Sequence, residues 1–470
     1  MNAEFSPSGF AKLALAATCA IALLAGSAAA ADLSSEAKQF WPQWRGPLGS
    51  GAAPLADPPL TWSETSNVKW KVKVPGSGNA TPIVWGDRVF VLTAVPTGKK
   101  VSATDIPAAT NPNLTGASTG RQGGVGGAGP SGEMYQFLVM CYDRNNGQLL
   151  WQKTAREETP QEGHHPDNGY ASASPVTDGE SVYAYFGSWG LHCYDLQGNL
   201  QWSKDFGRMQ TRMAFGEGAS PALYGGKIVV YWDDEKDNDF IAAFDKRSGK
   251  ELWRTPRSEQ TGWSTPLIVE YGGQAQVIVN AERKVRSYDL ANGKELWSCG
   301  GQGANTIPSP VASADTVYVT SGFQRNALVA IALGRTGDLT GTDAVRWSRN
   351  RNTPYAPSPL LVDDLLYVVT VNNNVISCLD AKSGTPHFEG TKLDDIGIGI
   401  YASPVAAKDR VYVLGRDGTC VVLKKAPAFE ILARNKLQDK ATASIALAGG
   451  DLFIRGAENL YCIAQAGSPK

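Results

Sequence analysis

An eight-bladed, all-β propeller is the fold that the sequence predicts, with four antiparallel strands in each blade. One phrase recurs along the chain: a strand that ends in Asp, a Gly-containing turn, and a strand that bears Trp. A second phrase precedes it, in which a small residue and Pro open an apolar stretch. The second phrase returns every 41 to 49 residues from Pro175 onward. Units of about 40–50 residues with four short strands are typical of propeller blades.

Eight copies of the second phrase mark the inner strands of eight blades. Seven of them carry Pro, which is tolerated at the first residue of a strand, and the eighth copy, Ser444-Ile445, lacks it. The seven prolines are Pro82, Pro175, Pro221, Pro266, Pro310, Pro359 and Pro404. In the Asp–Gly turns, Asp binds its own backbone and Gly accepts a positive φ, so these residues need no chemical role.

The repeated Trp residues mark the outer strands, and we expect them to pack between blades because each ring buries a large apolar area. They are Trp70, Trp151, Trp202, Trp253, Trp297 and Trp347. Blade eight has three strands of its own, near 443–446, 452–455 and 460–464, and residues 68–74 are expected to supply the fourth. Pairing both ends of the chain in one blade closes the ring and removes its edges.

These elements divide the chain into four parts. Residues 1–31 are expected to form a signal peptide, 32–61 a docked N-terminal extension, 62–465 one closed propeller and 466–470 a tail. Within the propeller, residues 97–133 form an insertion rich in Gly, Thr, Asn and Ala, expected to be a flexible loop between the second and third strands of blade one. A G-x-G-x-x-G in this loop lacks the strand–helix context of a nucleotide site.

The first 31 residues have the layout of a secretory signal. Lys12 precedes an apolar run from Leu13 to Ala25, and small residues follow up to Ala31. The run is too short to span a membrane. A periplasmic or secreted protein, cleaved near Ala31, is therefore expected, whereas lipidation of Cys19 is left open.

Composition excludes several classes of function. The 470 residues include 44 Lys+Arg and 45 Asp+Glu, for a net charge of −1, which argues against nucleic acid as a partner. The H-E-x-x-H, C-x-x-C and Walker patterns are absent from the sequence. No catalytic residue and no metal site are assigned.

Three segments resemble a known family: 40–47 (FWPQWRGP), 165–172 (HPDNGYAS) and 415–418 (GRDG). With the repeats, they are similar to the pyrroloquinoline-quinone (PQQ)-binding-like propellers of the quinoprotein dehydrogenase-like superfamily, in particular exported proteins of planctomycete-type bacteria. The resemblance implies one of two roles. Quinoprotein dehydrogenases hold PQQ and calcium at the centre of the ring, whereas the outer-membrane barrel-assembly lipoprotein uses the propeller as a binding scaffold.

The dehydrogenase pattern, as the resemblance implies it, includes adjacent cysteines over the quinone and an Asp base beside calcium-binding carboxylates. The sequence has no Cys-Cys pair, and no acid can be carried over to those roles. We therefore expect a non-catalytic scaffold that needs no cofactor and binds a protein, peptide or glycan. A PQQ- and calcium-dependent alcohol or sugar oxidoreductase is the alternative, in which Arg283, Asn305 and Arg325 would meet the carboxylates of the quinone. The identity of the partner and the oligomeric state are left open.

Strand order determines which loops share a face. The loops from strand four to the next blade, and those between strands two and three, lie on one face, here called the top; the Asp–Gly turns lie on the bottom. Aromatic and Arg side chains on top loops suit a binding site. The candidate binding residues are His165, Asn168, Tyr170, Glu217, Trp263, Arg283, Asn305, Arg325, Tyr355, Tyr401 and Arg416.

Three other groups have structural interpretations. His164 and His165 are adjacent and point to opposite sides of an extended segment, so they are not expected to share a metal. The acidic run 233–239 is interpreted as a solvated turn, because its spacing does not match an EF-hand. The cysteines after residue 31 are expected to be buried free thiols, since matching slots in facing sheets lie too far apart for a disulfide.

Overall fold

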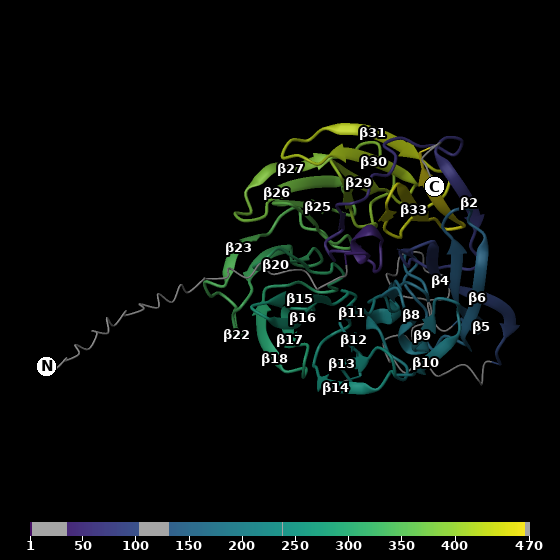
Figure 1. Cartoon of the computed structure of the whole chain (residues 1–470), viewed down its shortest axis with the longest axis horizontal. Helices are drawn as coiled ribbons and strands as arrows, with labels where there is room; N and C mark the ends of the chain where they lie inside the picture. Colours follow the sequence, from purple (N-terminus) through teal and green to yellow (C-terminus); the bar gives the residue numbers. More distant parts are fainter. Residues whose placement is uncertain (2–34, 103–130, 237, 466–470) are drawn as a thin grey trace.

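The computed structural model describes Met1 and residues 35–102, 131–236 and 238–465. Eight small sheets are arranged around a ring (Figure 1), and each contains four antiparallel strands, which follow chain order in all sheets but the last. The fold is the predicted eight-bladed propeller.

The strands of the first four blades are as follows. Blade 1 contains β3 (Ile83–Trp85), β4 (Arg88–Lys100), β5 (Glu133–Asp143) and β6 (Leu149–Glu158), and blade 2 contains β7 (Val176–Thr177), β8 (Ser181–Tyr185), β9 (Leu191–Asp195) and β10 (Leu200–Lys204). Blade 3 contains β11 (Ala222–Tyr224), β12 (Lys227–Trp232), β13 (Phe240–Asp245) and β14 (Glu251–Pro256), and blade 4 contains β15 (Leu267–Tyr271), β16 (Gln274–Asn280), β17 (Lys284–Asp289) and β18 (Glu295–Gly300).

The other four blades follow the same order. Blade 5 contains β19 (Val311–Ala312), β20 (Thr316–Ser321), β21 (Ala327–Ala332) and β23 (Val345–Arg349), and blade 6 contains β24 (Leu360–Val362), β25 (Leu365–Val369), β26 (Val375–Asp380) and β27 (Pro386–Lys392). Blade 7 contains β28 (Val405–Ala407), β29 (Arg410–Leu414), β30 (Thr419–Lys424) and β31 (Ile431–Lys436), and blade 8 contains β32 (Ala446–Ala448), β33 (Asp451–Arg455) and β34 (Asn459–Ala464), with β2 (Val68–Lys73).

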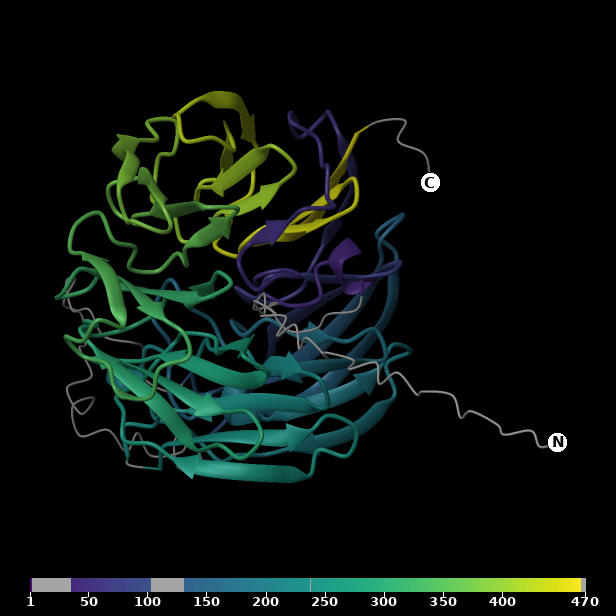
Figure 2. The same ribbon diagram turned by 60° about the vertical axis from the view of Figure 1, so that its left-hand side comes forward.

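The ring is closed by the two ends of the chain. Strand β2 pairs antiparallel with β34, and Trp70 lies opposite Cys462. In Figure 2 the purple β2 lies beside the yellow C-terminal strands. The predicted closure by an N-terminal strand is confirmed, and every blade thereby lies between two neighbouring blades.

Five of the six repeated Trp residues contact the next blade in the same way. The indole Nε1 of Trp202 donates to the carbonyl of Lys246, and a Cβ added to Gly249 would lie 2.7 Å from the Trp202 ring. The same pair of contacts recurs for Trp70, Trp151, Trp253 and Trp347. Trp297 differs, because the short β22 (Gly337–Asp338) pairs with the outer edge of blade 4 and Nε1 donates to Gln276 within the blade. The interpretation as packing between blades is confirmed.

A closed circle of hydroxyl groups lies where the chain enters the inner strands. Each backbone N–H donates to the hydroxyl of the equivalent residue in the next blade, at 2.7 to 3.1 Å. The eight residues are Thr81, Ser174, Ser220, Thr265, Ser309, Ser358, Ser403 and Ser444. The small residue of the second repeated phrase is thus always Ser or Thr, and it joins neighbouring blades around the axis.

The N-terminal extension fills the middle of the ring. Residues 41–53, here called the axial segment, contact the inner strands of several blades. Trp41 forms a β-bridge with Val84, β1 (Ala52–Ala53) pairs in parallel with β28, and the carbonyl of Pro42 accepts from Thr177. In Figure 1 this purple segment, with the 3-10 turn η1 (Ala37–Gln39), lies among the blades at the centre. The axis is therefore occupied by protein rather than by an open tunnel.

Several predictions fall partly outside the described residues. These are the signal segment, Cys19, the tail and most of the insertion, of which 97–100 and 133 belong to β4 and β5. The six cysteines in the described part are buried and free, as expected. No helix in that part is long and apolar enough to cross a membrane.

Candidate functional site

The top loops meet at the mouth of the ring around Asp167. This residue lies between blades 1 and 2, and its carboxylate accepts a hydrogen bond from the Tyr401 hydroxyl at 2.9 Å. It also forms an ion pair with Arg416, whose guanidinium lies 4.6 Å from the centre of the Tyr401 ring. Burial and the neighbouring Asp167 raise the pKa of Tyr401 to about 12, so its hydroxyl keeps the proton that it donates. Loops from distant parts of the chain are thereby fixed across the mouth.

A row of aromatic side chains extends from this point towards blade 3. The ring of His165 lies 5.2 Å from that of Phe215, which lies 6.4 Å from Trp263. The indole Nε1 of Trp263 donates to the carbonyl of Gly216 at 2.6 Å. His164 turns the other way and packs edge-on against Tyr170. As predicted, the two histidines point to different surroundings.

Exposed apolar side chains on the top loops lie next to an ion pair or an aromatic ring. Arg212 forms a 2.7 Å ion pair with Glu282, and the next residue, Met213, is 43% exposed with a φ of 52°. Phe323 is 38% exposed, and its ring lies 5.4 Å from that of Tyr355. Exposed large apolar side chains are typical of protein-binding surfaces.

A pocket opens between the entry loops of blades 2 and 3, here called the entry pocket. Two carboxylates line it. Glu162 accepts from the N–H and the hydroxyl of Thr211, and Glu217 accepts in the same way from Ser188. Burial raises the pKa of Glu162 to about 8 and that of Glu217 to about 7. Both acids therefore hold a proton over part of the neutral range and act as anchors for the loops.

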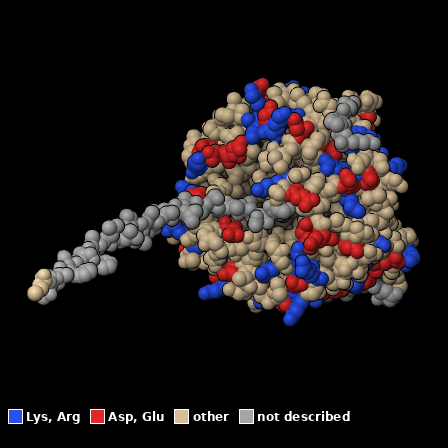
Figure 3. Space-filling view, viewed as in Figure 1, with Lys and Arg blue, Asp and Glu red and all other residues tan. Residues whose placement is uncertain are grey.

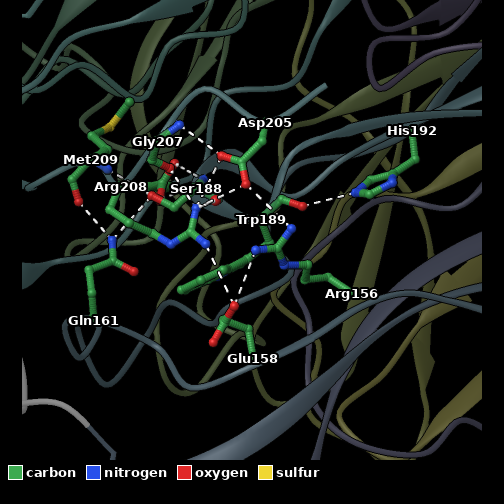
Figure 4. Close-up of polar contacts among 11 residues, drawn as sticks. Arg156, Glu158, Gln161, Ser188, Trp189, His192, Asp205, Gly207, Arg208 and Met209 are labelled. Atoms are coloured by element: carbon green, nitrogen blue, oxygen red, sulfur yellow. Dashed lines mark hydrogen bonds and ion pairs between the residues drawn. The ribbon is translucent and has the colours of Figure 1, made fainter. Parts of the chain in front are cut away.

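The outer wall of the entry pocket is held by a polar network (Figure 4). Arg208 lies 4.6 Å from the centre of the Trp189 ring and donates to the carbonyl of Ser188 at 2.8 Å. Its ion pairs with Glu158 and Asp205 connect the wall to the outer strand of blade 1 and to the end of blade 2. These contacts join the wall to both blades, and a wall held in place before binding favours binding without rearrangement.

The interpretation of 233–239 as a solvated turn is wrong. Asp233 and Arg257 form a 2.7 Å ion pair with both side chains fully buried. Burial alone would lower the pKa of Arg257, but the attraction of Asp233 outweighs it and raises the pKa, so the guanidinium stays charged. Asp234 and Asp239 are also buried and accept backbone N–H groups, whereas Asp237 lies outside the described residues. The acids tie blade 3 to the loop that leads into blade 4.

The predicted site residues fall into three groups. Those at or beside the mouth are His165, Asn168, Trp263, Tyr355, Tyr401 and Arg416. Tyr170 and Glu217 line the entry pocket. Arg283 and Arg325 are exposed, whereas Asn305 is buried near Tyr355.

Sequence reasoning missed Asp167, Arg212 and Phe215, and it missed the acid Glu162. Asp167 lies within the 165–172 segment that carries the resemblance, so a signal for it was present. Nothing local marks the other three, because their partners come from other blades.

A family model described as outer membrane protein assembly factor BamB matches residues 136–389, more than half of the chain. The chain belongs to this family. No curated protein sequence matches it.

Solved structures share the fold of this BamB-family chain at low identity. BamB from Moraxella catarrhalis superposes with a TM-score of 0.50 at 14% identity, covering 70% of this chain and 91% of that one. A quinohemoprotein alcohol dehydrogenase from Comamonas testosteroni gives 0.56 at 9% identity, and one from Pseudomonas putida gives 0.53 at 11%; both comparisons cover 92% of this chain and 81% of the other. These similarities establish the fold alone.

The residues of this BamB-family chain do not fit PQQ and calcium. Among the described residues, no group of three or more His, Cys, Asp or Glu side chains is placed to hold a metal ion. The acid at the mouth, Asp167, is already bound by Arg416 and Tyr401. The residues expected to meet the quinone differ in their exposure to solvent. The Arg283 side chain is 82% exposed, whereas Asn305 is buried.

Proposed function

We propose that this chain is an exported, non-catalytic propeller that binds a protein or peptide partner through its top face. The observation that carries the proposal is the exposure of Met213 and Phe323 on loops where the neighbouring Arg212 forms an ion pair and Phe323 packs against Tyr355. Such a surface binds without ordering its own loops, and this preserves affinity. Aromatic and Arg side chains around Tyr401 add the residue types that dominate interface energies.

Two further observations support the class of partner and the location. Positive and negative side chains are interspersed over the face shown in Figure 3, which suits a mixed protein surface better than a polyanion. The matched family is described as an assembly factor for outer membrane proteins. Together with the signal-like residues 1–31, this supports export.

Site-specific photo-crosslinking in the producing cell tests the proposal. A photoreactive phenylalanine at position 213 or 323 should give a discrete crosslinked product, whereas the same group at 200 or 252 should not. Leu200 and Leu252 are the matched controls, because they are 55% and 45% exposed but lie at the bottom ends of outer strands. The double variant Met213→Ser/Phe323→Ser should lose the product and Leu200→Ser/Leu252→Ser should keep it. Equal products from both faces would contradict the proposal.

The enzymatic alternative has its own direct test. The purified chain is incubated with PQQ and calcium, and bound-quinone absorbance and dye-linked oxidation of alcohols and sugars are recorded. We expect neither signal. Dye reduction that depends on PQQ would overturn the non-catalytic assignment.

A further inference from the structure

The top loops of blades 4, 5 and 6 carry basic side chains beside an aromatic pair. Arg283 lies in the loop between β16 and β17, and its side chain is 82% exposed. Arg325 lies in the corresponding loop of blade 5, two residues after Phe323, and both are exposed. The ring of Phe323 lies 5.4 Å from that of Tyr355, which belongs to the loop that leads into blade 6. These four residues are here called the basic patch.

Backbone contacts join the loops of the basic patch into one surface. The N–H of Gly301 donates to the carbonyl of Arg283 at 2.9 Å. Two residues further along, a Cβ added to Gly303 would meet the carbonyl oxygens of Phe323 at 2.5 Å and of Arg325 at 2.7 Å. Residues 301–303 therefore bridge the two loops that carry the arginines, and both guanidinium groups are within reach of one bound segment.

The acids around the basic patch already have basic partners. Glu282 lies 3.8 Å from Arg283, but it is closer to Arg212, and its side chain is only 8% exposed. Arg325 forms no ion pair within the part of the chain that the structure describes. The other pairs are Glu259 and Glu295 with Arg286, Asp338 with Lys284, and Glu389 with Arg349. Because each acid is held by another base, the positive charge of the patch remains available to a partner.

This positive charge is confined to one side of the top face. On the other side, residues 393–404 contain two acids and no basic residue. These acids, Asp394 and Asp395, are exposed and pair with Lys392 and Arg434. Acidic groups of a partner are therefore attracted to one part of the face only, which favours a short acidic segment over a long polyanion.

We propose that the basic patch binds a short acidic peptide segment of the partner. Its carboxylates meet Arg283 and Arg325, and an apolar side chain packs on Phe323. A guanidinium can bind a carboxylate through two parallel hydrogen bonds, and an exposed aromatic ring supplies apolar contact area. The inference rests on the proposed function, because it names the chemistry by which the same face recognises its partner.

Fluorescence anisotropy with the purified mature chain tests this chemistry. Two labelled peptides share a central Phe, which is flanked by Glu in one and by Lys in the other. We expect only the Glu peptide to bind, with an affinity that falls as NaCl rises from about 50 to about 500 mM, because salt screens exposed charges. Replacing the Phe of this peptide by Ala should weaken its binding about tenfold. No binding of the Glu peptide, or equal binding of both peptides, overturns the proposal.

Substitutions of exposed arginines locate the binding. Arg283→Gln/Arg325→Gln should weaken binding of the Glu peptide about fivefold, whereas Arg247→Gln/Arg335→Gln should leave it unchanged. The control residues Arg247 and Arg335 are matched because they are also exposed, but they lie in turns of the bottom face. Urea midpoints show whether both double variants are folded. Equal affinities of the two folded variants for the Glu peptide overturn the proposal.

The photo-crosslink from position 323 separates this inference from the proposed function. The crosslinked product should decrease in the background of Arg283→Gln/Arg325→Gln and persist in that of Arg247→Gln/Arg335→Gln. An undiminished product in both backgrounds overturns the acidic segment and leaves the proposed function standing. Absence of the product when no arginine is substituted contradicts both.

Discussion

On the bottom face the same turn returns from blade to blade, whereas each top loop is held by partners of its own. Asp143, Asp195, Asp245, Asp289 and Asp380 each accept N–H groups from residues two to four positions further along the chain. At the top, Asp167 meets Arg416, 249 positions away, and Arg212 meets Glu282, 70 positions away. Local contacts therefore build the bottom, and long-range contacts build the top.

The two faces have different requirements: the bottom holds the blades together, whereas the top has to present a particular binding surface. The bottom turns place a Gly against the Trp of the preceding blade, and this contact can be repeated without change. A binding surface needs a particular arrangement of side chains, so its loops cannot all be alike. The top loops lack the repeated Trp–Gly contact, and buried acids such as Asp233 and Glu162 hold them instead.

Removing one partner of the buried top-face pair should have the largest effect. Asp233→Asn removes the negative charge that faces the buried guanidinium of Arg257 and leaves it with neutral acceptors, the new amide oxygen and the Tyr288 hydroxyl at 2.6 Å. We expect the free energy of unfolding to fall by about 3–5 kcal/mol. Urea denaturation of the mature chain measures it.

The control for this prediction is an exposed pair. Glu251→Gln breaks the 2.7 Å pair with Arg254, in which both side chains are 39% exposed, and should change the free energy by about 0–1 kcal/mol. If the two variants lose the same amount, the buried pair does not hold the top loops.

A bottom-face change should cost somewhat less. In Gly249→Ala, the new Cβ would lie 2.7 Å from the Trp202 ring at a φ of +67°. Backbone strain and overpacking together should lower the free energy of unfolding by about 2–4 kcal/mol. Gly225→Ala is matched to it, since its φ is +54° and nothing lies within 4 Å, and should cost about 1 kcal/mol. Equal midpoints in urea would show that the contact with Trp202 does not stabilise the ring.

Periodicity made the ring and its closure predictable from sequence. Strand β2 was placed in blade 8 because Trp70 fills the repeated Trp position, and it pairs with β34 opposite Cys462. The hydroxyl circle was missed although all eight residues are Ser or Thr. A small side chain suffices to explain the packing, and only the three-dimensional circle shows that the hydroxyl accepts an N–H.

The top-face contacts were harder to predict because their partners are not periodic. The acidic run 233–239 has the composition of a solvated turn, and nothing in its spacing indicates that Arg257 folds onto it. Asp167 could be suspected only through the segment around it. The central position of the axial segment could not be predicted from the sequence either. The segment matches no repeat, and it pairs with several blades at once.

The top face should also be the more sensitive to pH, which is the smallest effect expected here. Because burial raises the pKa of Glu162 to about 8, the folded chain keeps a proton that the unfolded chain releases above about pH 4.5. The folded state binds more protons in this window, so stability should fall as the pH rises from 6 to 8. Glu162→Gln keeps an acceptor for Thr211 and removes the titration, and should reduce this fall by about 2 kcal/mol.

Urea midpoints at pH 6, 7 and 8 measure the difference between the two proteins. Some pH dependence should persist in the variant, because the pKa of Glu217 is also raised, to about 7. Glu157→Gln is the control: its pKa is lowered by Lys99 and Gln136, so its contribution is lost only when the pH falls below the neutral range. Parallel curves for Glu162→Gln and the unaltered chain would mean that Glu162 is ionised in the folded state. The top loops would then be held by a carboxylate rather than by a protonated acid.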